Sequence, residues 1–451
     1  MIASMKVARA PVEVEPDRGA RLDILLKRLN NCLAAFWLLM VSMLPRSGLA
    51  QITESLLPTA VPPSAPQEPR SAFAPIGLRL GDFFWFPRAE LDEAYNSNIF
   101  ATTTRPTYDL ITALTSSFDL LSSFPRNSLN LHGGSLLQVY ADHPAQNTQD
   151  GIVSADGTLD ITAGSYLYGT AQVAHQHISY GSPNSPGSIA QPVTYWDYTA
   201  TAGYAQGGRR FSYQVDGGVT AAQYNAAPLV GGGVLPQSFQ DATVSSAAVR
   251  GSYEIIPDYL GYVRVGGNLF NYWHTTRANF STYSVNLGLQ ILPRHLISGE
   301  AYAGYLAQNF AQSGLGSTST PDFGGRLTWN ITQLTTLTFT GLTIFSTGTP
   351  SSPTIINGSA GNSYLSKVLT ANADHQLLRN VLLNLYTSYE NDSFQGITRT
   401  DNVFNVGVGV RYLVNRNLFL GGSFSYYQRS STLAGASFNQ NILTLRVGTQ
   451  F

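Results

Sequence analysis

The chain has little charge, one cysteine and, outside one short segment, no long apolar run. Charged residues make up 12% of the 451 residues, whereas soluble domains usually contain about 25%. The net charge of −1 argues against a nucleic acid partner. Cys32 is the only cysteine, so the sequence excludes internal disulfides and thiolate metal sites. Mean hydropathy is only −0.03 although Gly, Tyr and Phe are plentiful, which favours a membrane β-barrel over a helical membrane protein.

The amino-terminal segment predicts export. Apolar residues 32–44 follow several basic residues, and Gly48-Leu49-Ala50 supplies the small residues that a signal peptidase reads. We therefore predict a signal peptide over residues 1–50; a transmembrane anchor is the alternative. Six prolines predict an extended periplasmic linker over residues 51–77. Residues 78–451 show no further break in composition and are predicted to form one domain.

That domain reads as strands with strictly alternating apolar and polar residues. Leu443, Leu445 and Val447 point one way in the last strand, whereas Thr444 and Arg446 point the other way. The same period recurs along the domain, and helical periodicity is absent after Ala50. A soluble sandwich could carry such strands, but eight short turns alternate regularly with nine long loops, which include residues 180–191 and 311–320.

This alternation predicts an all-β fold: a transmembrane antiparallel up-and-down β-barrel of about 18 strands, with 16 as the fallback. An even strand count would place both termini in the periplasm, with the barrel in the bacterial outer membrane. The last strand is expected to close the barrel by pairing with a strand near residues 86–95, which removes both open edges.

Charges opposite the apolar faces predict the lumen, because a charge facing lipid at mid-membrane costs a few kcal/mol. Ten residues are candidates for the pore lining: Asp197, Asp216, Arg250, Arg264, Glu300, Arg326, Asp374, Glu390, Arg411 and Arg446. Their signs balance. They could form a salt-bridged wall, and they could also favour neutral or zwitterionic polar solutes.

Aromatic residues gather near the predicted strand ends, which is typical of an interfacial girdle. They include Tyr95, Phe100, Tyr108, Tyr140, Tyr180, Tyr195, Trp196, Trp273, Tyr283, Tyr389, Tyr426 and Phe451. A second group of tyrosines is predicted to face the lumen, where the rings could stack on sugars. These sugar-stacking candidates are Tyr262, Tyr302, Tyr386 and Tyr427.

Signals for an enzyme are weak. The seven histidines are scattered, and His175 and His177 share a strand face without a third ligand at a suitable spacing for a metal. No nucleophile elbow or glycine-rich phosphate loop is present. We therefore expect no enzyme, no cofactor and no metal site. A hydrolase at the barrel rim, using a loop histidine such as His274, is the least favoured alternative.

The segment Tyr95-Asn96-Ser97-Asn98-Ile99-Phe100 resembles a motif of a β-barrel porin family of bacterial outer membranes. Acidic Glu90, Asp92 and Glu93 precede it, and residues 108–111 follow at the family's spacing. The resemblance covers residues 78–451. Some members lie in exopolysaccharide loci, so it implies an outer-membrane barrel that assists exopolysaccharide export.

The resulting hypothesis is a porin-like channel for polar solutes. The alternative is a structural or assembly barrel with an occluded lumen that binds envelope components. Expected partners are outer-membrane lipid, the barrel-assembly machinery, and polysaccharide or export components. The assembly machinery would recognise terminal Phe451 as its signal.

Overall fold

The computed structural model describes residues 73–186, 189–274, 279–293, 295–311, 317–347 and 363–451. The predicted signal peptide and residues 51–72 of the predicted linker lie outside these ranges, while residues 73–77 form a turn and irregular chain. No helix in the described part is both long and apolar enough to cross a membrane.

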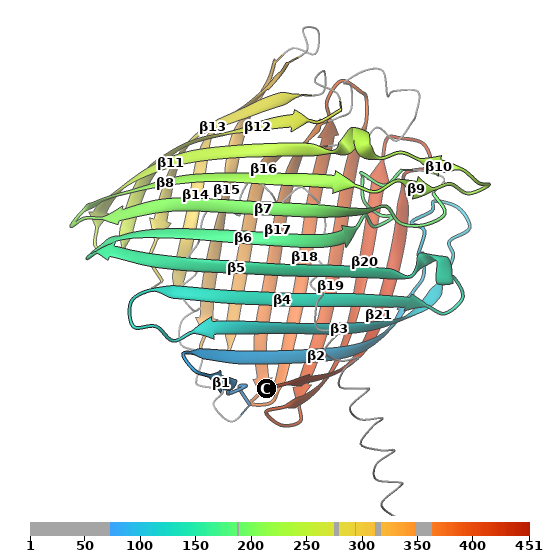
Figure 1. Ribbon diagram of the computed structural model, residues 1–451, viewed down its shortest axis with the longest axis horizontal. Helices are drawn as coiled ribbons and strands as arrows, with labels where there is room; N and C mark the ends of the chain where they lie inside the picture. Colours follow the sequence, from blue (N-terminus) through green and yellow to red (C-terminus); the bar gives the residue numbers. More distant parts are fainter. Residues whose placement is uncertain (1–72, 187–188, 275–278, 294, 312–316, 348–362) are drawn as a thin grey trace, which may run out of the picture. The chain divides into compact units, whose positions relative to one another are not determined.

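One sheet of 19 strands dominates the structure and closes on itself (Figure 1). The short β1 (Leu78–Leu80) pairs with β2 alone, and the other eighteen strands form the closed wall. They are β2 (Phe83–Asn96), β3 (Asp109–Ser122), β4 (Ser128–Tyr140), β5 (Thr148–Thr162), β6 (Ser165–His177), β7 (Thr194–Gly207), β8 (Phe211–Tyr224), β11 (Ala242–Ile256), β12 (Tyr259–Tyr272), β13 (Phe280–Ile291), β14 (Ile297–Phe310), β15 (Ser317–Thr332), β16 (Thr335–Thr347), β17 (Ser363–Leu378), β18 (Val381–Phe394), β19 (Thr400–Leu413), β20 (Leu418–Ser431) and β21 (Phe438–Gln450). The predicted count of 18 is confirmed, and the fallback of 16 is wrong.

Short turns and long loops alternate around the wall as predicted. The turns join β3 to β4, β5 to β6 and so on to β19 and β20, while the longer connections lie at the opposite end. The connection from β8 to β11 contains both the small hairpin of β9 (Ala227–Pro228) and β10 (Val234–Leu235) and the 3-10 helix η3 (Ser238–Gln240). The connection from β4 to β5 contains the 3-10 helix η2 (Pro144–Gln146). Some predicted loops were too long: residues 317–320 already belong to β15.

The two faces of the wall follow the alternation of the sequence. Large apolar side chains such as Leu445, which is 65% exposed, cover the outer face. The opposite face is concave, because Arg250 on β11 reaches Glu300 on β14 across two intervening strands. Such a contact requires side chains that converge inside the barrel.

The barrel closes between β2 and β21, in register from Arg88↔Gln450 to Asn96↔Ile442. This confirms the predicted closing pair. The Phe451 backbone N–H donates to the Pro87 carbonyl at the turn end (3.1 Å). The carboxy-terminus therefore lies beside the start of the first wall strand (Figure 1).

The family-like motif holds the loop end of the same closure. The Gln440 amide donates to Asn96 Oδ1 (2.8 Å) and to the Asn98 carbonyl (3.0 Å). Asn98 is almost fully buried and donates to the Asn439 carbonyl (3.0 Å). The motif thus joins the first long loop to the last strand, which explains why asparagines are needed there.

Candidate functional site in the lumen

All ten predicted pore-lining residues lie on the strand face opposite the exposed apolar residues. They are not equally accessible. Asp197, Asp216 and Arg250 are buried, whereas Arg326 and Asp374 are exposed on the concave side. The buried members are engaged with the wall: Asp216 accepts a hydrogen bond from Gln214 (3.0 Å) and one from Tyr168.

Arg250 forms the centre of one such network. Its guanidinium donates to Glu300 (2.8 Å) and to Gln290 (2.8 Å), and it lies 3.6 Å from the centre of the Tyr262 ring. The other face of that ring lies on Gly288, where a Cβ would overlap it. Tyr262 is 5% exposed and has both ring faces covered. The prediction that Tyr262 stacks on sugars is therefore wrong.

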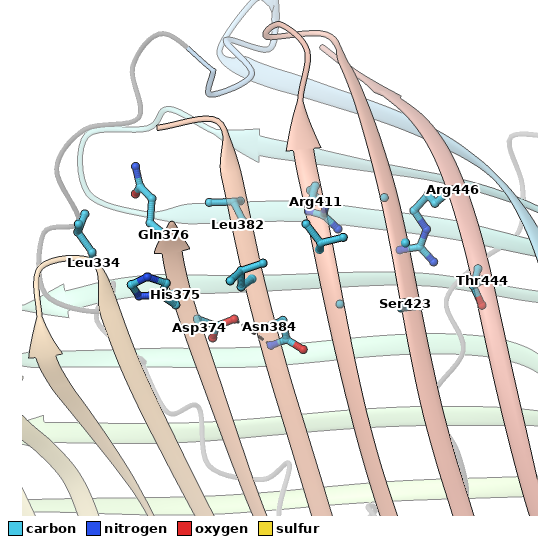
Figure 2. A pocket seen from close by; sticks show the side chains of 15 residues that line it. Leu334, Asp374, His375, Gln376, Leu382, Asn384, Arg411, Ser423, Thr444 and Arg446 are labelled. Carbon is cyan, nitrogen blue, oxygen red and sulfur yellow. Dashed lines mark hydrogen bonds between the residues drawn. The ribbon is translucent and has the colours of Figure 1, made fainter. Parts of the chain in front are cut away.

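A cavity of about 500 Å³ opens in the lumen wall near the turn end. Figure 2 shows Asp374, Asn384, Arg411 and Arg446 projecting into it from β17, β18, β19 and β21. The Asn384 amide donates to Asp374 Oδ1 (3.0 Å). Three predicted pore-lining residues, Asp374, Arg411 and Arg446, thus meet in one place, and carry both signs of charge.

Phe419 contacts two arginines, of which Arg411 lines this cavity. Its ring is fully buried on the lumen side and lies flat on Gly448, where a Cβ would overlap it. The guanidinium groups of Arg88 and Arg411 lie 5.0 Å and 4.9 Å from the ring centre. Cation–π contact therefore orients Arg411. The alternation of the sequence places Phe419 on the inner face, but does not reveal these partners.

Arg446 completes the charged wall at the barrel closure. It donates two hydrogen bonds to Asp92 (2.7 and 2.6 Å), and Glu90 lies 3.0 Å from its Nε. Arg88 forms a second ion pair with Glu90. Both acids are buried, although the sequence identifies them only as neighbours of the family motif.

The remaining aromatic predictions have mixed outcomes. Tyr302 and Tyr386 are partly exposed on the lumen side, whereas Tyr427 stacks on Phe438 with ring centres 5.3 Å apart. Trp196 and Tyr389 lie on the outer face, as expected for a girdle. Tyr195 does not: it is buried on the inner side, so its assignment to the girdle is wrong.

The described parts of the connection between β6 and β7, residues 178–186 and 189–193, fold inward and are called the inward loop. At its base Ile178, Ile189 and Val193 are buried with Tyr195 and Tyr224 in an apolar cluster. Apolar burial of this kind gives a loop a fixed position.

Polar contacts continue from this base. Tyr180 packs against the cluster and donates to Gln146 Oε1 (2.7 Å). Burial raises the pKa of Tyr180 to about 12, so the hydroxyl keeps the proton that it donates. Gln146 in turn donates to the Ala190 carbonyl (2.9 Å).

The middle of the loop reaches distant parts of the wall. The Asn184 amide donates to the Thr347 carbonyl on β16 (3.2 Å), although six strands, β8 and β11–β15, separate β7 from β16. Arg429 on β20 donates to the Gly181 carbonyl (3.0 Å). The inward loop therefore crosses the barrel at its loop end, through Gly181 and Asn184, and narrows the lumen.

Several histidines pair with acids at the loop end. His143 lies 2.7 Å from Asp109, His177 lies 2.9 Å from Asp150, and His274 lies 3.4 Å from Asp241. The acids also hold the backbone: Asp241 accepts the Tyr224 N–H (2.7 Å). These contacts give the pairs a structural role in fixing the loops.

Residues 70–451 match the family model described as "Putative beta-barrel porin 2". The chain belongs to this family. It is a porin-like β-barrel of the bacterial outer membrane, and its apolar outer face contacts membrane lipid. Family and fold indicate a channel rather than an enzyme. The resemblance read from residues 95–100 is thereby confirmed.

Solved structures similar to this porin are also outer-membrane proteins. OpdK of Pseudomonas aeruginosa is 11% identical, with 81% of this chain and 99% of that chain covered and a TM-score of 0.41. P. aeruginosa OccK2 (OpdF), solved with glucuronate, is 12% identical, with 82% of this chain and 99% of that chain covered and a TM-score of 0.42. OccAB2 of Acinetobacter baumannii is 9% identical, with 82% of this chain and 98% of that chain covered and a TM-score of 0.44. No curated protein matches the porin. TM-scores below 0.5 do not transfer a substrate to it.

Proposed function

We propose that the porin is a passive channel for polar solutes, in which the accessible members of the ten inward charges line the path and the buried members hold the wall. The observation that carries the proposal is the cavity where Arg411 and Arg446 face Asp374. Opposite charges on one wall give a polar or zwitterionic solute a partner for each end. A solute with a large net charge is repelled by the wall charges that have the same sign as the solute.

Replacing Arg411 by Glu is expected to change ion selectivity. The substitution removes one positive charge from the lumen and adds a negative one, so cations should be favoured. In planar bilayers under a KCl gradient, the reversal potential should shift toward the potassium equilibrium potential, with a permeability ratio changed by about threefold or more for one reversed wall charge. Arg411→Gln should give a smaller shift of the same sign. An unchanged reversal potential in both variants would show that Arg411 does not line the ion path.

A second candidate function rests on the inward loop. Because Gly181 and Asn184 contact distant strands, the loop could occlude the lumen, and the barrel would then serve in envelope assembly. Single-channel recording separates the two functions, since an occluded barrel conducts no ions. Export of exopolysaccharide stays a prediction from the family resemblance. Partly exposed Tyr302 and Tyr386 are the remaining candidates for contact with sugar rings.

We also propose that Phe451 is read by the barrel-assembly machinery, with both termini in the periplasm. Supporting observations are its position at the end of the closing strand and its exposed side chain. Deleting Phe451 should reduce the amount of folded, heat-modifiable porin in outer membranes about tenfold. A chain whose last strand is not recognised does not close its barrel, and the open strand edge is unfavourable. Phe451→Trp should restore it. Equal membrane levels of the deletion variant and wild type would contradict this role.

A further inference from the structure

The barrel wall is forked between β15 and β16. Their ladder runs from Thr332↔Thr335 only as far as Gly325↔Gly341. Toward the loop end, residues 317–324 of β15 continue with β14, and residues 342–347 of β16 continue with β17. Within this described stretch, one side-chain bond bridges the two strands: the Thr343 hydroxyl donates to the Phe323 carbonyl (3.1 Å). The fork leaves backbone edges unpaired inside an otherwise closed sheet.

The local sequence accounts for the fork. Gly325 has φ +146°, and a Cβ there would overlap the Glu300 carbonyl oxygen. Gly324 is covered by the Tyr302 ring and also approaches Gly341. Pro321 cannot donate a backbone hydrogen bond, which is why proline is largely restricted to strand edges. Glycine thus permits the change of direction, and proline disfavours a continuous ladder beyond it.

Beyond the fork, β16 and β17 lie on the lumen side of β14. Phe345 packs with Leu306, which belongs to the inner face of β14, and with Leu365. The Ser363 hydroxyl donates to Gln308 Oε1 (3.3 Å), also on the inner face of β14. Phe345 and Ser363 belong to the outward-facing series of their own strands. The two edges therefore overlap rather than meet side by side.

The overlap creates a groove of about 630 Å³. Pro321, Phe323, Leu342 and Leu369 supply apolar contacts, and Lys367 adds a cation. A smaller cavity of about 60 Å³ on the lumen side also contacts Leu342. Thr343 lines both spaces, so a thin layer separates the groove from the lumen.

Lys367 is unusual in both sequence and position. It is the only lysine after Lys27, and it is exposed on the same outward face as Leu369. Among the described residues its side chain makes no ion pair or hydrogen bond. A lysine facing lipid costs about 2–4 kcal/mol at mid-membrane and about 0–1 near the interface. A negatively charged group beside Lys367 would offset that cost.

We propose that the fork binds an anionic amphiphile from the membrane, with its acyl chain in the groove and its carboxylate or phosphate on Lys367. Phe323, Leu342 and Leu369 provide the apolar lining for the chain. The amphiphile enters from the membrane because Lys367 and Leu369 face outward. This site is separate from the charged cavity proposed for polar solutes.

Dodecanoate binding to the purified full chain in a neutral maltoside detergent tests the site, with dodecanol as the uncharged probe. Lys367→Gln should weaken dodecanoate binding about tenfold, the value of one charge-assisted hydrogen bond. Dodecanol binding should not change, and Lys367→Arg should retain dodecanoate. Equal dodecanoate affinity for wild type and Lys367→Gln would overturn the proposal.

A reversible closure of the fork provides the second test. Phe323→Cys with Thr343→Cys, in a Cys32→Ser background, places two cysteines across the fork. Oxidation should abolish dodecanoate binding, and reductant should restore it. The control pair Thr328→Cys with Thr338→Cys lies in the continuous ladder and should have no effect. Undiminished binding to the oxidised fork variant would exclude the groove. Heat-modifiable migration verifies folding, and unchanged bilayer conductance separates this site from the channel.

Discussion

Deleting residues 181–186, the middle of the inward loop, is expected to raise single-channel conductance about two- to fourfold. A barrel of 16–18 strands encloses an aqueous channel unless something fills it, and the loop crosses that space. The deletion removes both long-range anchors, Gly181 and Asn184, while Ile178, Ile189 and Val193 keep the apolar base. Conductance of the purified variant in planar bilayers, at matched salt, gives the ratio to wild type.

The matched control is deletion of Gly231–Gly233 from the β9–β10 hairpin. These residues are exposed, and a Cβ at any of the three would meet no neighbour. This variant should conduct like wild type. If wild type is silent and the loop deletion conducts, the barrel is occluded and the assembly function is favoured. If the loop deletion conducts no more than wild type, the loop does not limit flow.

The barrel could be predicted because strand alternation is a local property. Placing Leu443 outward fixes Arg446 inward, whatever the rest of the chain does. The same parity puts all ten candidate charges on the face opposite the exposed apolar residues, and their role in lining a pore stays a prediction. Turn and loop residues then supplied the strand count, and closure followed because an open edge is unfavourable in lipid.

The partners of these charges could not be predicted. Arg250 meets Glu300 only because the wall curves across two intervening strands. Tyr262 was expected to present a free ring, but Arg250 and Gly288 cover it. Periodicity gives the face on which a side chain lies, whereas contact depends on register, curvature and tilt, which are set by the complete sheet.

The inward loop and the fork were missed for a related reason. The sequence predicts residues 180–191 as a loop, but does not say whether it folds outward or across the lumen. For the fork, Pro321 and the Gly324–Gly325 pair were available as signals, because proline within a strand indicates an edge. The sequence instead predicts residues 311–320 as a loop, although residues 317–320 belong to β15. That boundary hid the unpaired part of β15.

Replacing Arg446 by Met is expected to destabilise the barrel by about 2–3 kcal/mol, because buried Asp92 loses its partner. The value lies below the ~3–5 kcal/mol expected when a fully buried pair is broken. Arg446 is 34% exposed, which lowers the expected cost. Refolding from urea into lipid vesicles measures the change. Arg326→Met is the control, because Arg326 is exposed and makes no ion pair among the described residues.

The double substitution Arg446→Met with Asp92→Leu identifies the cause. It removes the orphaned carboxylate, while Arg88 still pairs with Glu90. Stability should recover to within about 1 kcal/mol of wild type, as expected when a buried pair is replaced by apolar groups. Arg446→Lys should be less stable than the double variant, because an ammonium group cannot form the bidentate contact that Arg446 makes with Asp92. If the double variant is as unstable as Arg446→Met, the closure depends on packing of the arginine stem rather than on its charge.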